Sequence, residues 1–577
     1  MPERFLGVIT GGSFAKGLQA RIRTHLAIED IKIGQFVAIE SESLRFFGMI
    51  NDVMLGATSQ AVLLDPPTPN DDTPALVREV LHGVYTYGDA HIQPSLALLE
   101  GEGENKHGPV RSVPAHFTPV YLAEESDFSE VFGAEDIDQH GGKYFAVGRP
   151  LDMDSNICLD LEKFAERSNG IFGKSGTGKS VLTRLLLAGM IRSGVCANLI
   201  FDMHNEYGDG SRSEGPNPWM RGLKSLFPSR VHSFGVRDSK PGDKRKPRTS
   251  RSDGELVIGL NQIEVEDILM LRQELDLSTA ATDSLYLLQE RLGQNWLSRF
   301  LEMDNEEAVE LSGAHESSLK TLHRKLRAKI VNLPFVEKQA GFNQIDQIVH
   351  YLENGRHVII EFGSNDNLLS YILVANIITR RIHDAYRKKF AESRGSQNPA
   401  DQPNRVMITI EEAHKFLTPE VANQTIFGTI AREMRKYNVT LLVVDQRPSS
   451  IDNEVLSQIG TRIVALLNDE RDIEAVFTGI SGANSLKTVL ASLDSRQQAL
   501  VLGHAAPMPV VIRTRPFDEQ FYKQITAGFS SVSPLNYSPS QNGNSSSNGN
   551  DGWFYNSEED EEEQKKQVQK DEADLFG

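Results

Sequence analysis

Residues 171–182 read Ile-Phe-Gly-Lys-Ser-Gly-Thr-Gly-Lys-Ser-Val-Leu, and residues 173–180 match the pattern G-x-x-x-x-G-K-[ST] at every fixed position. Glycines in such a loop allow backbone turns that point N–H groups inward, where they surround phosphates. An apolar strand candidate precedes the loop, and a leucine-rich helical pattern follows it. A chance match in a glycine-rich loop would lack these flanks, so the stretch predicts a nucleotide-binding site.

Different residues of this loop are expected to contact the phosphates and the magnesium ion. Lys179 reaches the β- and γ-phosphates of the nucleotide, and the Ser180 hydroxyl ligates Mg²⁺. The helix that follows adds the positive end of its dipole. We therefore expect ATP and Mg²⁺ as cofactors, bound by Gly173, Lys174, Ser175, Gly176, Thr177, Gly178, Lys179, Ser180 and Val181.

The composition is that of a folded globular protein with an acidic balance. The 577 residues are 39% hydrophobic and 24% charged, and the net charge of −19 excludes a chain that binds nucleic acid by bulk charge. The two cysteines, Cys158 and Cys196, form no C-x-x-C pair, so neither a zinc site nor a disulfide framework is predicted. No stretch approaches about 20 apolar residues and no secretory signal begins the chain, so we expect a cytoplasmic protein without membrane attachment.

Composition and periodicity divide the chain into five segments. Short β-type runs in residues 1–140 predict a small β-barrel. Alternating strand and helix patterns in residues 141–255 and 341–527 predict an α/β core, a parallel sheet with helices on both faces. Leucines at helical spacing make residues 256–340 a helical insertion in that core, and residues 528–577 should form a disordered tail.

Charge is distributed unevenly along the chain. Residues 551–577 contain ten acids and three lysines, a net charge of −7, which suits a docking peptide, an internal mimic of nucleic acid or a solubilising tail. Residues 237–251 and 320–329 are rich in Lys and Arg. Both basic segments could contact nucleic-acid phosphates or simply be solvated, and the sequence leaves these alternatives open.

Hydrolysis of ATP needs carboxylates beside the phosphate loop. The apolar strand at residues 405–410 ends in Glu411 and Glu412, which places both at the carboxyl edge of the sheet. We assign Glu411 to the magnesium shell and Glu412 to the attacking water. Asp202 ends another strand and is a candidate for metal or phosphate contacts, although a capped turn would explain it equally well. Gln446 ends a third strand, where a carboxamide can sense the γ-phosphate.

Two arginines on the helix between these strands are candidates for a second role. Arg432 and Arg435 are three residues apart and so share one helix face. A guanidinium aimed at the γ-phosphate of a neighbouring subunit stabilises transition-state charge and makes hydrolysis depend on assembly. Surface ion pairing is the alternative for each of them.

Taken together, these motifs resemble the HerA family of DNA translocases, which belongs with the FtsK-like motor ATPases. The resemblance covers about residues 1–515 and excludes the tail. It rests on five stretches, at residues 173–180, 202–207, 410–417, 431–436 and 446–449. The five stretches together are specific for this family, although the phosphate loop alone is not.

The resemblance implies a RecA-like core in a hexameric ring that pumps double-stranded DNA through its pore. It also implies a partner nuclease of the NurA type, bound through the barrel, and a role in DNA end resection and recombinational repair. By the same resemblance, Arg435 or Arg432 acts in trans, and Arg167 matches a second arginine near the nucleotide of the adjacent subunit. Two positions depart from the family. Glu411 stands where many relatives have Asp, and Asp445 stands where many have a small polar residue.

Two alternatives to a DNA translocase remain. A conjugation- or secretion-type motor ATPase would use the same core chemistry on another substrate. An ATP-gated assembly scaffold would use nucleotide only to control recruitment of a partner. The paired glutamates argue against the scaffold, because a pure binding switch needs no residue that activates water.

Overall fold

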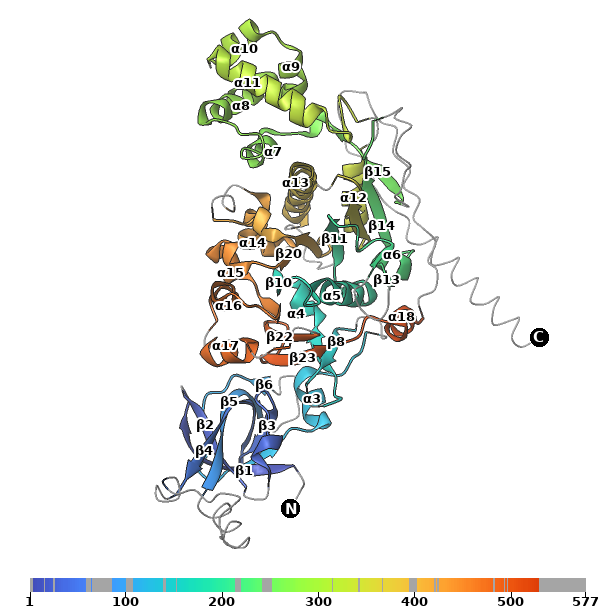
Figure 1. Cartoon of the computed structure of the whole chain (residues 1–577). Coiled ribbons are helices and arrows are strands. Elements are labelled where there is room, and N and C mark those ends of the chain that lie inside the picture. Colours follow the sequence, from blue (N-terminus) through green and yellow to red (C-terminus); the bar gives the residue numbers. More distant parts are fainter. Residues whose placement is uncertain are drawn as a thin grey trace, which may run out of the picture. The chain divides into compact units, whose positions relative to one another are not determined.

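The structure is a computed structural model, and each of its parts is described here by itself (Figure 1). The described residues are 4–14, 16–23, 26–58, 64, 86–99, 107–137, 142–151, 153–212, 219–240, 252–313, 315–340, 343–365, 367–393, 402–419, 422, 425–480, 483–491, 493–494 and 497–528. The predicted tail therefore lies outside them, apart from its first residue, as does most of the basic loop at 237–251. Among the residues described, no helix combines the length and the apolar character needed to cross a bilayer.

The N-terminal segment forms the predicted β-barrel. Its strands follow the order β2-β1-β7-β3-β4-β5, and pairing of β2 with β5 closes the ring. A bulge at Ser95 of β5, opposite Phe47 and Gly48, and one at Asn51 of β4 increase the local twist that closure requires. The strands are β1 (Phe5–Ser13), β2 (Gly17–Ile22), β3 (Phe36–Glu40), β4 (Leu44–Ala57), β5 (Thr86–Leu99), β7 (Pro119–Leu122) and, appended to β5, β6 (His107–Gly108).

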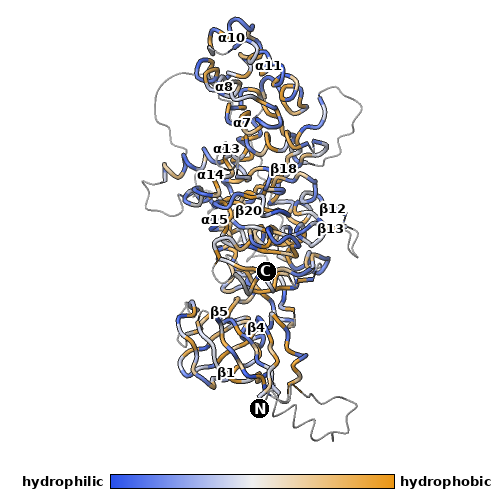
Figure 2. The backbone as a smooth tube through the Cα atoms, turned by 60° about the vertical axis from the view of Figure 1, so that its left-hand side comes forward, coloured by the Kyte–Doolittle hydropathy of each residue, from blue (hydrophilic) through white to orange (hydrophobic). Residues whose placement is uncertain are grey.

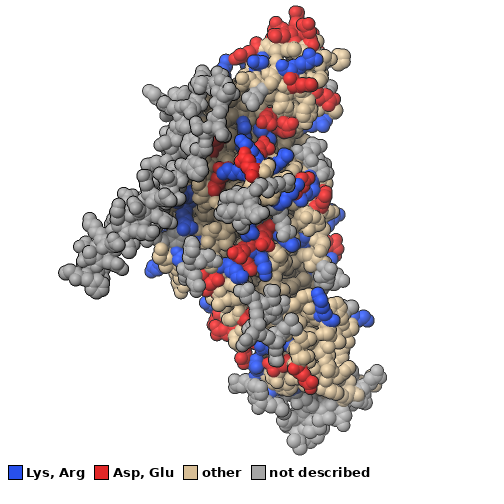
Figure 3. Space-filling view, turned by 180° about the vertical axis from the view of Figure 1, so that it is seen from behind, with Lys and Arg blue, Asp and Glu red and all other residues tan. Residues whose placement is uncertain are grey.

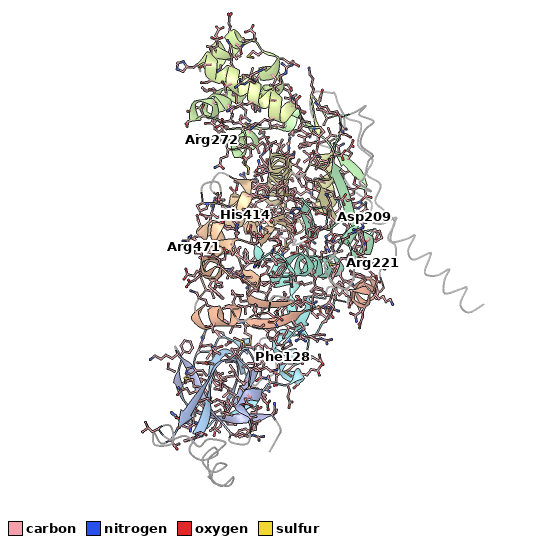
Figure 4. The ribbon with its side chains drawn as sticks, in the orientation of Figure 1. Phe128, Asp209, Arg221, Arg272, His414 and Arg471 are labelled. Carbon is pink, nitrogen blue, oxygen red and sulfur yellow. The ribbon has the colours of Figure 1, made fainter. Side chains whose placement is uncertain are left out.

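Helix α3 (Glu125–Phe132) follows the barrel and packs on it. Phe128, labelled in Figure 4, lies edge-on to Phe36 at 5.3 Å and to Phe47 at 5.8 Å between ring centroids. All three rings are buried and belong to the same apolar cluster as the core of the ATPase sheet. One face of the barrel therefore shares a continuous hydrophobic core with α3 and the residues that follow, whereas the barrel interior forms a separate cluster that includes Val37 and Ile50.

The second segment is built on one large sheet. Its strand order is β15-β14-β18-β11-β19-β20-β10-β21-β22-β23-β8-β9. The described strands are β8 (Tyr144–Arg149), β9 (Ile157–Asp160), β10 (Asn169–Phe172), β11 (Ala197–Asp202), β14 (Val231–Val236), β15 (Gly254–Leu256), β18 (His357–Glu361), β19 (Val406–Glu411), β20 (Val439–Asp445), β21 (Thr461–Ala465), β22 (Gln498–Gly503) and β23 (Val510–Thr514).

The sheet is parallel from β15 to β21, as predicted for the core. Every residue of β11, β19 and β20 is buried, which fits strands covered on both faces by helices. Figure 2 shows hydrophobic residues following these strands through the middle of the segment. From β21 to β9 the pairing is antiparallel, and the short connections between β22 and β23 and between β8 and β9 allow no crossover helix.

The helices around the sheet include α5 after the phosphate loop and α13 along the opposite side of the motif-bearing strands. Their bounds are α4 (Leu161–Ala165), α5 (Lys179–Ser193), α6 (Leu223–Leu226), α12 (Gln344–Glu353), α13 (Leu368–Ser393), α14 (Ile426–Glu433), α15 (Asn453–Gln458), α16 (Glu470–Val476), α17 (Ala483–Ala491) and α18 (Glu519–Thr526). Strand β14, at the far side of the sheet, was not predicted from the sequence.

The predicted insertion is helical. It contains α7 (Val265–Met270), α8 (Thr279–Leu292), α9 (Trp296–Glu302), α10 (Asn305–Ser312) and α11 (Glu316–Leu326). A buried ion pair ties it to the core, since Arg380 of α13 donates to Asp267 of α7 at 2.7 Å. The lysines of the basic segment pair locally: Lys320 with Glu316, and Lys325 with Asp276. These pairs favour the solvated alternative for this segment.

Candidate active site

The phosphate loop joins β10 to α5 and is anchored to the two neighbouring strands. The Gly173 N–H donates to the Asp445 carbonyl at 3.3 Å, and the Lys174 N–H donates to the Leu466 carbonyl at 3.0 Å. Gly176 and Gly178 adopt φ of 80° and 95°, a left-handed conformation that glycine tolerates best. Helix α5 starts at Lys179, so its unpaired N–H groups face the loop. Ser180 and Val181 lie on the first turn of that helix and are partly exposed.

Lys179 lies between the loop and the carboxylates of β19 and β20. Its ammonium donates to the Lys174 carbonyl oxygen at 3.0 Å. Burial lowers the pKa of Lys179, and this effect is opposed first by Glu412 and then by Asp445 and Glu411. Phe172, just before the loop, pairs with Asp445, and Glu411 pairs with Val444, so the loop, the two predicted glutamates and Asp445 lie at one edge of the sheet, where the carboxyl ends of parallel strands converge.

One carboxylate oxygen of Glu411 is hydrogen-bonded and the other is not. Tyr207 donates its hydroxyl to Glu411 Oε1 at 2.7 Å, whereas the buried Oε2 has no hydrogen-bond partner. Burial raises the pKa of Glu411 to about 7. A buried carboxylate oxygen without a partner suits a cation, so Glu411 fits the predicted magnesium shell together with the Ser180 hydroxyl. Among the described residues no three His, Cys, Asp or Glu side chains cluster as a metal site.

Asp202 has a different environment from the one expected of a metal ligand. Its two oxygens accept the backbone N–H groups of Glu206 at 2.8 Å and Tyr207 at 2.7 Å. Burial raises the pKa of Asp202 to about 7, and the nearby Glu411 adds to the shift. The structure thus shows the capped turn, in which each Asp202 oxygen accepts one N–H. The turn positions Tyr207, the partner of Glu411.

Glu412 and Gln446 come together as the sequence predicted. Glu412 has φ 49° and ψ 46°, a conformation that non-glycine residues seldom adopt. Its Oε2 lies 3.4 Å from Gln446 Nε2. The same oxygen lies 3.5 Å from His414 Nδ1, a residue labelled in Figure 4 and given no role by the sequence analysis. The position of His414 two residues after the predicted base was the only available signal.

The arginines lie away from the phosphate loop. Arg167 lies just before the amino end of β10, whereas the phosphate loop follows the carboxyl end of this strand. The four residues of β10 therefore separate Arg167 from the loop. Arg432 of α14 lines the same hollow as Arg167, a cavity of about 350 Å³ that Arg462 also lines. Arg432 donates to the Ala422 carbonyl at 3.1 Å and lies 3.8 Å from Glu454. The side chain of Arg435 lies outside the described residues, and its backbone belongs to the turn η8 (Met434–Tyr437).

Known proteins share these features. Residues 145–382 match the family described as Helicase HerA, central domain. The DNA double-strand break repair helicase HerA of Sulfolobus acidocaldarius is 24% identical over 505 residues, which cover 86% of this chain and 91% of that protein. The protein of the same name from Pyrococcus furiosus is 20% identical over 545 residues, or 90% and 93% of the two chains. The resemblance to HerA predicted from the motifs is thus confirmed, and with it the assignment as an ATP-hydrolysing enzyme of the helicase type.

A solved structure is also similar in part. VirB4 of Thermoanaerobacter pseudethanolicus is 15% identical, and the alignment covers 66% of this chain and 98% of that one with a TM-score of 0.40. A score of this size is too low to bear on function. The architecture of the core is instead established by its own strand order and by the phosphate loop between β10 and α5.

Proposed function

We propose that this chain is an ATP-driven motor that moves double-stranded DNA through a hexameric ring during DNA end resection and recombinational repair. The observation that carries the proposal is the strand register, which pairs Phe172, just before the phosphate loop, with Asp445 and pairs Glu411 with Val444, so that the loop and the two glutamates share the carboxyl edge of the sheet. Similarity over most of the chain to helicases named for double-strand break repair supports DNA as the substrate. A partner nuclease docked on the barrel belongs to the same proposal.

The chain's own residues would divide the chemistry as follows. The backbone N–H groups of the loop and Lys179 bind the β- and γ-phosphates and stabilise charge that develops on them. Ser180 and Glu411 would hold Mg²⁺, which when bound neutralises phosphate charge. Glu412 orients the attacking water and accepts its proton, and Gln446, in contact with Glu412, lies where it can report the γ-phosphate.

Turnover would need a neighbouring subunit. The hollow lined by Arg167 and Arg432 opens at the amino ends of the strands, whereas the nucleotide binds at their carboxyl ends. In that hollow the Nε of Arg167 is buried without a hydrogen-bond partner, whereas the Nη1 of Arg432 lies 3.8 Å from the Glu454 carboxylate. An unsatisfied guanidinium donor suits an anionic group, and in a ring this group would be the γ-phosphate of the adjacent subunit. Arg435 remains a further candidate for the same role.

The location of the DNA contacts follows from charge. Among the described residues of the face seen in Figure 3, Lys and Arg are interspersed with Asp and Glu. With a net charge of −19, attraction to DNA must come from basic residues concentrated at one place, which in a ring would be the pore. Stimulation by DNA should therefore fall steeply with salt.

The test combines an assembly measurement with ATPase assays on blunt, overhanging and single-stranded DNA. We expect a hexamer whose ATPase is stimulated by duplex DNA, and a Glu412→Gln variant that binds ATP but neither hydrolyses it nor translocates. An intact hexamer that no DNA stimulates would overturn the proposal and favour the conjugation- or secretion-type motor. A Glu412→Gln chain that still recruits its partner and functions would favour the ATP-gated scaffold.

A further inference from the structure

The ends of β19 and β20 are joined by a single buried carboxylate. Asp445, the last residue of β20, is 2% exposed. Its Oδ2 accepts the backbone N–H of His414 at 2.7 Å, and its Oδ1 accepts the backbone N–H of Arg447 at 2.7 Å. One side chain therefore holds the turn that follows Glu412 and the turn that follows Gln446 in a fixed relation. A small polar residue at this position would have too few acceptors to do the same.

The ring of His414 is oriented by the same carboxylate. Its Nδ1 lies 3.0 Å from Asp445 Oδ2 and 3.2 Å from Oδ1, so this nitrogen carries a proton and donates it to Asp445. The hydrogen bond to Asp445 raises the pKa of His414, and Glu412 acts in the same direction while burial and Lys415 oppose it. The ring is thus fixed with its N–H directed toward carboxylate oxygens.

Glu412 lies within reach of this ring. Its Oε2 is 3.5 Å from His414 Nδ1 and 3.4 Å from Gln446 Nε2. Glu412 also has the left-handed backbone conformation, which persists in a non-glycine residue only where surrounding contacts impose it. The backbone bond from His414 to Asp445, two residues away, is such a contact.

We propose that His414, oriented by Asp445, is a positioning residue that sets the side chain of Glu412 for its work on the attacking water. This inference rests on the proposed function, in which Glu412 activates the attacking water. Because Asp445 also holds the backbone beside Gln446, a shift of the Gln446 turn moves His414 and, through it, the catalytic glutamate. The glutamate is thereby aligned only when the Gln446 turn is in place.

The alternative is that Asp445 and His414 merely stabilise two turns. Three variants separate these roles in the full-length assembly: His414→Phe keeps the ring shape without a donor, His414→Asn restores an N–H near the Nδ1 position, and Asp445→Asn removes the charge that orients the ring. His350→Phe, an exposed histidine on α12, is the matched control. For each variant, kcat and KM for ATP are measured with DNA present, alongside equilibrium ATP binding and the melting temperature.

We expect His414→Phe to lower kcat about tenfold with ATP affinity within about twofold of the parent, since only alignment of the base is lost. His414→Asn should recover most of that loss, and His350→Phe should change nothing. The limb of the kcat–pH profile that belongs to His414 should move to lower pH in Asp445→Asn, because the carboxylate that raises its pKa is gone. Unchanged kcat in His414→Phe, or equal loss in His414→Phe and His414→Asn, would overturn the proposal.

A double-mutant cycle with Glu412→Asp, a shortened base with measurable residual turnover, keeps the test decisive even where His414→Phe folds poorly. If His414 acts through Glu412, Asp445→Asn should lower turnover far less in the Glu412→Asp background than in the parent. Multiplicative losses would show that His414 acts independently and would overturn the inference. Full turnover in Glu412→Gln alone would instead refute the role of Glu412 in the proposed function, which makes the two failures distinguishable.

Discussion

Gly460 offers a direct test of the arginine hollow, because the side chain of Arg167 lies across it. A Cβ added at Gly460 would sit 2.7 Å from both the Cβ and the Cδ of Arg167. Carbon atoms prefer separations of about 3.5–4.0 Å, so the arginine must move by roughly 1 Å. The backbone at Gly460 has no positive φ, which means that alanine itself is unstrained there. Gly460→Ala therefore shifts Arg167 from its Cβ outward, guanidinium included, without removing its charge.

A displacement of about 1 Å at a group that stabilises a transition state costs on the order of 100-fold in rate. We expect kcat of the Gly460→Ala ring to fall between about 10- and 100-fold, while ATP affinity stays constant because the phosphate loop is untouched. Arg167→Ala should cause a similar loss, and the double variant should be little worse than either single one.

The assay is DNA-stimulated ATP hydrolysis by assemblies whose mass is verified to match the parent. Gly108→Ala is the matched control, since a Cβ at Gly108 meets nothing within 4 Å. The backbone hydrogen bond from Gly460 N–H to the Ser168 carbonyl at 2.7 Å is compatible with alanine, so the melting temperature should change by only a few degrees. Normal kcat in Gly460→Ala combined with a large loss in Arg167→Ala would refute the placement of Arg167 on which the reasoning depends.

Three further outcomes are expected. Lys179→Ala chains mixed into parent rings should depress ATPase activity beyond their own share, and a strictly proportional loss would contradict a site shared between subunits. Because the folded-state pKa of Glu411 is raised to about 7, the folded state keeps a proton that the unfolded chain loses above its ordinary pKa, so stability falls as pH rises from about 4.5 to 7. Glu411→Gln should then raise the free energy of unfolding at pH 8 by about 1–3 kcal/mol in denaturant titrations while abolishing turnover; equal stability would contradict the burial argument. Arg380→Leu leaves Asp267 buried without its cation and should cost about 3–5 kcal/mol in the same titration, most visibly as early loss of the helical insertion, whereas Lys320→Leu on the surface should cost under about 1 kcal/mol.

The parts of this fold that the sequence predicted are those with strong local patterns. The phosphate loop requires a strand before it and a helix after it, and β10 and α5 are there. Glu411 and Glu412 follow an unbroken apolar run, so their meeting with Lys179 follows from parallel strands sharing one carboxyl edge. Strand β14 was missed because His232, Ser233 and Gly235 interrupt its apolar pattern, although most of the strand is buried.

Other features depend on contacts that no local pattern encodes. Asp202 could be a metal ligand or a turn cap by sequence, and only its two hydrogen bonds to the following backbone favour the cap. His414 acquires its surroundings from Asp445, 31 residues away on the neighbouring strand. Arg167 and Arg432 share a hollow although more than 260 positions separate them, and their distance from the phosphate loop is visible only in three dimensions.

Strand β10 connects the two halves of the proposed mechanism. Its carboxyl end leads into the phosphate loop, and Arg167 precedes its amino end by two positions. Asn169, the first residue of the strand, is fully buried, donates to the Arg167 carbonyl at 2.7 Å and accepts the Thr461 N–H at 3.2 Å, so the arginine's backbone is fixed to the sheet. In the proposed ring, Arg167 reaches the nucleotide of the neighbouring subunit. A shift of β10 in response to the nucleotide of its own subunit would then move the arginine that acts on the neighbour's nucleotide. In the proposed ring, the central strand of each subunit would then link consecutive ATP sites.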